Sequence, residues 1–349
     1  MKIKNLVREN ILNLKPYTSA RSSYLSGILL DANENGFGSV VEDEYSLELN
    51  RYPDPAQKSL RKKMSEYLNV PEANICFGVG SDEIIDLLIR IFCEPRIDKV
   101  MILQPTYGMY KVACDINNVK TINVDLTESF QIDFGKIKEF YSDEVKIIFL
   151  CSPNNPTGGL ISKSDIINLA DSCDSIIAVD EAYIDFSEND TLTSEVLNHN
   201  NIVVIRTFSK AWGLAGIRCG YCVADEFIIS LLMNVKAPYN INKFIFHIIN
   251  EAISRKSVKD DFVTRILHER ERVFNELIDL KGIDEVYHSD SNFLLFRCDN
   301  SKNILNSLAE KGIIIRERSG HKYLNNCLRV TIGTVEENML FLKSIKELL

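Results

Sequence analysis

The sequence predicts an α/β fold with a mostly parallel central sheet in a large domain, followed by a smaller α+β domain. From about residue 74 onward, short β-branched and apolar runs alternate with longer amphipathic stretches. Most of the short runs are apolar throughout, as expected for strands covered on both faces of a sheet. The chain has 349 residues, 45% apolar and 26% charged, which suffices for one large domain and a smaller one.

The elements of the large domain follow in order. The strand candidates are "NICFGV", "KVMILQ", "KTINVD", "VKIIFLC", "SIIAVD", "NIVVIRTF" and "CGYCVA". Helical periodicity marks "SDEIIDLLIRIFC" and "SKSDIINLADSC" between them. This alternation is typical of strand–helix–strand units.

The pattern changes after "APYNIN", residues 237–242. A long charged helix is predicted near residues 258–281, followed by the strands "NFLLFRC", "KGIIIRER" and "CLRVTIGT" and a closing helix, "EENMLFLKSIKELL". We therefore expect an N-terminal arm over residues 1–26 that packs on the small domain, a large domain over 27–242 and a small domain over 243–349. Because no Pro- or Ser-rich linker separates the two domains, we expect them to be in close contact.

Charge and cysteine usage exclude several classes of partner. The net charge is −9, and no Lys/Arg cluster is long enough to follow a phosphate backbone, which argues against nucleic acid. No apolar run approaches the roughly 20 residues that span a membrane, and the start of the chain lacks the apolar segment of a signal peptide. The nine cysteines lie mostly in apolar runs, which indicates reduced, buried thiols and a cytoplasmic protein.

The Cys-x-x-Cys formed by Cys219 and Cys222 is predicted to be structural. On a strand these two positions face opposite sides of the sheet and cannot bridge. No second pair of Cys or His completes a zinc site, so no metal is expected.

The stretch "FGVGSDEIIDLL" reads as a strand, a Gly-rich turn and the start of a helix. The backbone N–H groups of Gly80, Ser81 and Asp82 would point at an anion on the helix N-terminus. The third glycine of a dinucleotide fingerprint is missing, so a nicotinamide site is poorly supported. On this stretch alone a plain Ser N-cap is the better explanation.

Two further strands end on polar residues, where open α/β sheets bind ligands. In "CSPNNPTGG", Asn155 precedes a proline and is held extended, so its amide can be aimed at a ligand; a structural turn is the alternative. In "IIAVDEAYIDF", Asp180 emerges from a buried strand, which is costly without a cation or strong donor. Asp180 and Glu181 face opposite ways and cannot flank one glycosidic bond. We expect a cationic partner for Asp180.

Lys210 lies among small and apolar residues in "TFSKAWGLAGIRCGYC". Loss of hydration disfavours its ammonium form and makes its amine a candidate nucleophile for a carbonyl. Ser209 and Arg218 offer the donor types that bind phosphate. The alternative is a surface loop with solvated Lys and Arg.

Taken in order, "GVGSDE", "PTYGMY", "SPNNPTG", "VDEAY" and "TFSKAWGLAGIRCGY" closely resemble the fold-type I pyridoxal-phosphate (PLP) aminotransferases. The resemblance runs from "LKPY" near the start to "LRVTIGT" near the end. It implies that Lys210 bonds covalently to PLP and later moves a proton. It also implies that Asp180 pairs with the protonated pyridine nitrogen, and that Asn155 and Tyr183 hydrogen-bond the ring oxygen.

The same resemblance assigns the remaining cofactor contacts. Tyr107 would stack on the ring face, although a core aromatic is its alternative. Tyr52 in "RYPDP" would reach the PLP phosphate of the neighbouring subunit, which makes a homodimer the functional unit. The phosphate contacts within the subunit would come from Gly80, Ser81, Asp82, Ser209 and Arg218.

Within this family, "LDANEN", "RYPDP", "PTYGMY" and "LRVTIGT" are most similar to members that act on histidinol phosphate. This similarity implies transamination between L-histidinol phosphate and 2-oxoglutarate, giving imidazole-acetol phosphate and glutamate, in histidine biosynthesis. Arg329 would bind the substrate phosphate in one half-reaction and the glutamate carboxylate in the other, since one guanidinium fork suits both anions. Arg316, Tyr17 and Asn33 are further candidates for substrate binding.

Alternatives on the same scaffold remain open. They are an aromatic amino-acid aminotransferase, a PLP lyase such as threonine-phosphate decarboxylase, and a PLP-binding regulatory module. No DNA-binding segment is found for the last. The sequence has "PYTSAR" and "NENG" where the family often has Pro-Gly after "PY" and "NENP", which leaves the contacts of the N-terminal arm open.

Overall fold

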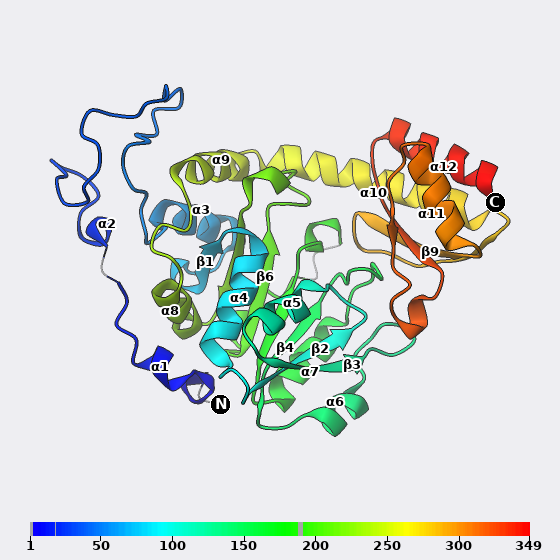
Figure 1. The fold of residues 1–349 in the computed structure, drawn as a ribbon, viewed down its shortest axis with the longest axis horizontal. Helices are drawn as coiled ribbons and strands as arrows, with labels where there is room; N and C mark the ends of the chain where they lie inside the picture. Colours follow the sequence, from blue (N-terminus) through cyan, green and yellow to red (C-terminus); the bar gives the residue numbers. More distant parts are fainter. Residues whose placement is uncertain (1–2, 18, 188–190) are drawn as a thin grey trace.

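The computed structural model describes residues 3–17, 19–187 and 191–349, and its centre is a seven-stranded sheet (Figure 1). The strand order is β1-β7-β6-β5-β4-β2-β3. The pairs among β2 to β6 are parallel, whereas β7 runs antiparallel to β6 and β1. The α/β prediction is therefore confirmed. The strands are β1 (Ile75–Gly78), β2 (Lys99–Gln104), β3 (Lys120–Asp125), β4 (Val145–Cys151), β5 (Ile176–Asp180), β6 (Ile202–Thr207) and β7 (Gly220–Ala224).

Helices cover both faces of this sheet. One face packs against α3 (Lys58–Leu68), α6 (Phe134–Phe140), α7 (Lys163–Ser172) and α9 (Lys243–Ser254). The other packs against α4 (Gly80–Phe92), α5 (Met109–Ile116) and α8 (Glu226–Val235). Cys219 lies in the first core and Cys222 in the second. The two thiols thus face opposite sides of the sheet, as predicted, and all nine cysteines are buried and unpaired.

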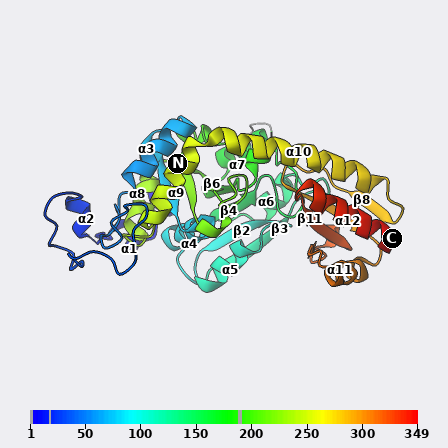
Figure 2. The same cartoon turned by 90° about the horizontal axis from the view of Figure 1, so that it is seen from above.

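A second, antiparallel sheet of order β10-β11-β9-β8 forms the small domain. Its elements are α10 (Lys256–Ile278), β8 (Ile283–Val286), β9 (Phe293–Cys298), α11 (Ser301–Glu310), β10 (Arg316–Glu317), β11 (Cys327–Thr331) and α12 (Val335–Leu348). Figure 2 shows α10 running from the large domain across to the small one. The predicted strand "KGIIIRER" shortens to β10 because β11 pairs with only two of its residues. The strand β8 was not predicted.

The structure differs from the predicted domain limits at two points. Ile3 and Leu6 of the 3₁₀ helix η1 (Ile3–Leu6) are buried in the same core as α4 and α8, and Arg8 pairs with Glu94 at 2.9 Å. The start of the arm therefore packs on the large domain, not on the small one. The apolar face of α9, with Ile249 at its centre, also belongs to the large-domain core. An amphipathic pattern shows that a face is buried but not against which partner, so these positions needed the tertiary structure.

The arm continues with the short helix α1 (Glu9–Leu12), whose Ile11 and Leu12 pack against the same core, and with α2 (Ala20–Ser23). Residues 24–57, which follow, form no helix or strand (Figure 1). Across the residues that the structure describes, no helix is long and apolar enough to cross a membrane. Those same residues contain no group of three or more His, Cys, Asp or Glu side chains suited to a metal ion.

Candidate active site

A cavity of about 150 Å³ opens at the carboxyl ends of β4, β5 and β6. Cys151, Asp180 and Thr207, the last residues of these strands, line it. Open α/β sheets bind their ligands at this edge. The cavity brings together most of the cofactor-binding residues predicted from the sequence, namely Ser81, Asp82, Tyr107, Asn155, Asp180, Tyr183, Ser209, Lys210 and Arg218.

Asp180 is buried in the wall of the cavity, with 3% of its surface exposed. Burial raises the pKa of its carboxyl to about 6, although hydrogen bonds from the Tyr110 hydroxyl and the Ala182 backbone N–H oppose the shift. The donor–acceptor distances are 2.8 Å and 3.0 Å. Within the described residues these neutral donors, and no cation, contact the carboxyl. Tyr110 stacks on Phe149. It was not predicted, because only Tyr107 of the motif "PTYGMY" was assigned a role.

Lys210 follows β6 and lines the cavity with its amine. Its Nζ lies 5.5 Å from the centre of the Tyr183 ring. Burial lowers the pKa of the ammonium, and the charge of Arg329 lowers it further, while Asp180 opposes the shift. No hydrogen bond from another described residue holds the amine. A lowered pKa makes the amine easier to deprotonate, and an amine that faces a cavity is placed to react with a carbonyl.

Lys236, which is buried, shows why a lowered pKa alone would not identify the site. Burial also lowers the pKa of Lys236. Its Nζ, however, donates to the backbone carbonyls of Pro55, Ala237 and Pro238 at 3.0, 3.3 and 3.2 Å. Lys236 is therefore held as a structural donor, whereas Lys210 faces open space.

The N-terminus of α4 forms one end of the cavity. Val79 is the N-cap and makes no side-chain cap, so the serine N-cap weighed from the sequence does not occur. The first backbone N–H groups of the helix, at Gly80 and Ser81, thus stay available for an anion. Gly80 has φ +74°, and a Cβ there would lie 2.7 Å from Nη2 of Arg218. Glycine lets the guanidinium approach this end of the helix.

Arg218 lies beside these groups in a left-handed conformation with φ 55°. Its Nη2 is 3.2 Å from Asp82 Oδ2 and its Nη1 is 3.5 Å from Ser209 Oγ. Ser209 is oriented through its backbone N–H, which donates to Thr207 Oγ1 at 3.1 Å. Thr207 lines the cavity but was not predicted. The Arg218 guanidinium, the hydroxyls of Ser209 and Thr207 and the N-terminus of α4 together form a set of donors that suits a phosphate.

The middle of the cavity is lined by amide and phenol groups. Asn155 donates from Nδ2 to the Tyr183 hydroxyl at 3.3 Å. Tyr107 donates to Asp82 Oδ1 at 3.3 Å and meets Tyr110 edge to face. Burial raises the pKa of Tyr107 to about 12 and that of Tyr183 still further above its usual range. Both phenols are therefore protonated donors at neutral pH.

Arg329 of the small domain does not line the cavity itself but contacts Asn155 in its wall. It extends from β11 and donates from Nη1 to Asn155 Oδ1, while its guanidinium lies 5.0 Å from the Phe293 ring centre. Burial, followed by the charge of Arg318, lowers its pKa. Arg316 is its partner in the β10–β11 register but is exposed and does not line the cavity.

Arg318 is a further cation that the sequence interpretation missed. It lines a larger cleft of about 1200 Å³ between the domains, which Tyr107 and Asn155 connect to the Lys210 cavity. Its Nε is buried without a hydrogen-bond partner in the described part of the chain. The period-two alternation of a strand could have identified it, since positions 316 and 318 share one face.

Three predicted residues lie elsewhere in the chain. Tyr17 is 75% exposed on the arm. Asn33 and Tyr52 line a separate cavity of about 510 Å³, where Tyr52 stacks on Tyr239 with ring centres 4.4 Å apart. None of the three reaches the Lys210 cavity of its own chain, so their roles stay predictions.

The groups around the cavity suit one kind of ligand. A buried carboxyl fits a protonated ring nitrogen, an amine fits an aldehyde, and the α4 N-terminus with Arg218 fits a phosphate. Pyridoxal 5'-phosphate carries these three groups on one ring. The fold and the cavity together define a PLP-dependent enzyme with an α/β large domain.

The chain belongs to the aminotransferase class I and II family, whose model matches residues 27–345. This family depends on PLP. A histidinol-phosphate aminotransferase of Cytophaga hutchinsonii is 43% identical over 346 residues, which cover 99% of this chain and 98% of that protein.

Solved structures agree with this fold. The histidinol-phosphate aminotransferase of Clostridium acetobutylicum matches with a TM-score of 0.79 at 28% identity, covering 86% of this chain and 91% of that one. An L-threonine-O-3-phosphate decarboxylase of Porphyromonas gingivalis matches with a TM-score of 0.74 at 20% identity, over 90% of this chain and 98% of that one. The fold alone therefore does not select the reaction.

Proposed function

We propose that the protein transfers an amino group between L-histidinol phosphate and 2-oxoglutarate, yielding imidazole-acetol phosphate and glutamate, reversibly. The observation that carries this proposal is the position of Arg329, a small-domain cation that reaches Asn155 at the edge of the Lys210 cavity. The identity of 43% to a histidinol-phosphate aminotransferase over nearly the full length supports the same substrate. Histidine biosynthesis is the role that follows.

When bound, PLP supplies the carbonyl that accepts the amino group and a ring that withdraws electrons from the substrate. Lys210 would hold the cofactor through its amine and would carry a proton to and from the reacting carbon of the substrate. Asp180 would keep the ring nitrogen protonated. Asn155 and Tyr183 would donate to the ring oxygen and orient the ring. Ser81, Ser209 and Arg218 would bind the phosphate.

Arg329 meets the anionic end of each substrate in turn. Histidinol phosphate has no carboxylate, so its phosphate takes the place that the carboxylate of glutamate occupies in the other half-reaction. A planar guanidinium binds both anions through paired N–H donors. The cleft between the domains, with Arg318 in its wall, leaves room for the imidazole end of the substrate.

We also propose that the functional unit is a homodimer with shared sites. Residues 24–40 expose large apolar side chains close together in sequence, with exposures of 69% to 104%: Tyr24, Ile28, Leu30, Phe37 and Val40. Exposed apolar surface of this extent is typical of an interface. A second copy covering it would bring Tyr52 to the cofactor phosphate of the neighbour. The nine buried, unpaired thiols support a cytoplasmic setting, where thiols stay reduced.

A donor screen with 2-oxoglutarate tests the proposed reaction. L-histidinol phosphate, phenylalanine, tyrosine and threonine phosphate are compared by the glutamate formed and by release of carbon dioxide, with Lys210→Ala as the inactive control. We expect the largest kcat/KM for glutamate formation with histidinol phosphate. A preference for phenylalanine or tyrosine would assign an aromatic aminotransferase, and carbon dioxide from threonine phosphate would assign a lyase; either would overturn the proposal.

A further inference from the structure

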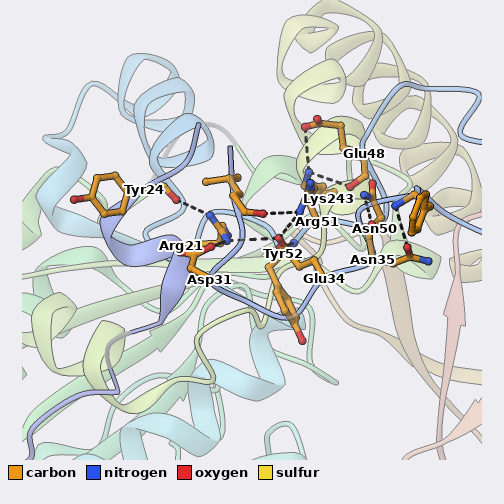
Figure 3. A network of polar contacts seen from close by, with 12 residues as sticks. Arg21, Tyr24, Asp31, Glu34, Asn35, Glu48, Asn50, Arg51, Tyr52 and Lys243 are labelled. Atoms are coloured by element: carbon orange, nitrogen blue, oxygen red, sulfur yellow. Dashed lines mark hydrogen bonds and ion pairs between the residues drawn. The ribbon is translucent and has the colours of Figure 1, made fainter. Parts of the chain in front are cut away.

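Glu34 lies at the centre of a polar network that joins separate stretches of residues 21–52 (Figure 3). Its side chain is only 3% exposed, although residues 24–57 form no helix or strand. Oε1 accepts a hydrogen bond from the backbone N–H of Tyr52 at 2.7 Å. Oε2 accepts one from Arg51 Nη1 at 2.9 Å and lies 3.5 Å from Arg21 Nη2.

The two arginines fix Glu34 from opposite sides. Arg21 is 2% exposed and also contacts Asp31 and the carbonyl of Tyr24. Arg51 also donates to the carbonyl of Leu29 at 3.2 Å. Burial raises the pKa of Glu34, but the hydrogen bonds from Tyr52 and Arg51 and the charge of Arg21 outweigh it and lower the pKa. The carboxylate is therefore ionised at neutral pH and bound by charge-assisted hydrogen bonds.

Tyr52 is held at two points as a result. Its backbone N–H is bound by Glu34, and its ring stacks on Tyr239 of the large domain. The ring remains 47% exposed and points away from the network (Figure 3). Glu34 thus determines where a half-exposed phenol is presented on a segment that lacks other regular structure.

We propose that Glu34 is a positioning residue that acts across the dimer: it places Tyr52 of its own subunit for the cofactor phosphate of the neighbouring subunit. This inference rests on the proposed homodimer with shared sites. It adds that the site of one subunit depends on an ion network located in the other. The motif "DANENG", which supplied only Asn33 as a candidate in the sequence, then contributes through its glutamate.

The variant Glu34→Gln removes the charge and one of the two strong acceptors. The matched control is Glu48→Gln in the same irregular segment, residues 24–57, where the side chain is 76% exposed and lies 3.7 Å from Lys243. The readout is PLP retention, measured from the visible absorbance of the bound cofactor after dialysis at a series of free PLP concentrations. We expect Glu34→Gln to bind PLP about 10- to 100-fold more weakly, the effect of losing a hydrogen bond to a charged group. The control should bind normally.

Both variants should sediment as dimers, which separates positioning from loss of the interface. A Glu34→Gln dimer that holds PLP as tightly as the unaltered protein would overturn the inference. The same conclusion would follow if Glu48→Gln weakened PLP binding equally, because the arm as a whole and not Glu34 would then be responsible.

Hybrid dimers show in which subunit Glu34 acts. A Glu34→Gln subunit is paired with a differently tagged Lys210→Ala subunit, so that the only Lys210 site receives Tyr52 from the subunit with an intact Glu34. We expect this site to recover PLP retention and activity to the level of a hybrid of unaltered and Lys210→Ala subunits. An unrecovered site would overturn the inference.

The corresponding hybrid of Tyr52→Phe and Lys210→Ala subunits tests the shared-site proposal separately. Its site should also recover, since Tyr52 again comes from the unaltered position of the partner. If this hybrid fails to recover, the proposed sharing of Tyr52 between subunits is wrong. If it recovers and the Glu34→Gln hybrid does not, only the role of Glu34 is wrong.

Discussion

Asparagine in place of Asp180 is expected to stabilise the cofactor-free protein while removing most of its activity. The carboxyl is 3% exposed and is met by two neutral donors. Burial raises its pKa from 3.8 to about 6. Because the folded state disfavours the charged form, the ionised carboxylate destabilises the apo protein, and the neutral amide does not.

The size of the effect follows from the shift in pKa. Each unit corresponds to about 1.4 kcal/mol, so ionised Asp180 destabilises the apo fold by about 3 kcal/mol at pH 8. The destabilisation declines as the pH falls through 6 towards 3.8, and at pH 4 it is below about 1 kcal/mol. The amide of asparagine can accept only one of the two hydrogen bonds well, which offsets about 1 kcal/mol. We therefore expect a net gain of about 2 kcal/mol at pH 8.

The measurement is guanidinium unfolding of the apo proteins at pH 8 and pH 4, together with kcat/KM of the PLP-loaded enzymes. The variant should be the more stable protein at pH 8, and its advantage should vanish at pH 4. Its kcat/KM should fall on the order of 10²- to 10³-fold, as for loss of a preorganised charge. If the apo variant is less stable than the unaltered protein at pH 8, Asp180 is not a buried carboxylate that lacks a cationic partner in the apo protein, and the account is refuted.

Three further predictions concern other parts of the molecule. Arg329→Ala should raise the KM for both histidinol phosphate and glutamate, and an effect on only one of them in steady-state kinetics would contradict a shared anion site. Asp185→Asn should destabilise the protein by about 3–5 kcal/mol in denaturant titrations, since Asp185 pairs with buried Arg206 at 3.1 Å; a change below about 1 kcal/mol would show that this pair is dispensable. All nine thiols are buried, and burial raises the pKa of Cys219 to about 12. The native protein should therefore not react with Ellman's reagent until it is unfolded, whereas rapid labelling of the native protein would show an accessible thiol.

Local sequence predicted the parts of the site that depend on strand ends. Asp180 ends a continuous apolar run and Lys210 lies among small and apolar residues, so a loss of hydration could be inferred before any tertiary contact was known. Gly80 and Arg218 could be placed only through the resemblance, since their approach joins α4 to the loop before β7. Most strands of the large sheet were recognised because they are apolar on both faces; the edge strand β3 is the exception.

Other contacts arise from pairings that no local pattern encodes. Tyr110 meets Asp180 only because the fold places α5 beside the end of β5. Strand alternation could relate Arg318 to Arg316, but only the fold of the small domain shows that this face borders the cleft. The faces of η1 and α9 were recognisable as apolar, but which core they join depends on the whole chain. Glu34 lies in a segment without periodicity, so its burial could not be predicted from the sequence.

The central claim, that Lys210 bonds covalently to PLP, is tested most directly by borohydride reduction of the PLP-loaded protein followed by peptide mass mapping. Reduction makes the bond permanent, so the modified lysine carries the added cofactor mass. Lys236 is the internal comparison, because burial also lowers its pKa while three carbonyls hold its amine. We predict the cofactor mass on the peptide that contains Lys210. Modification at Lys236 or another lysine, with Lys210 unmodified, would contradict the account.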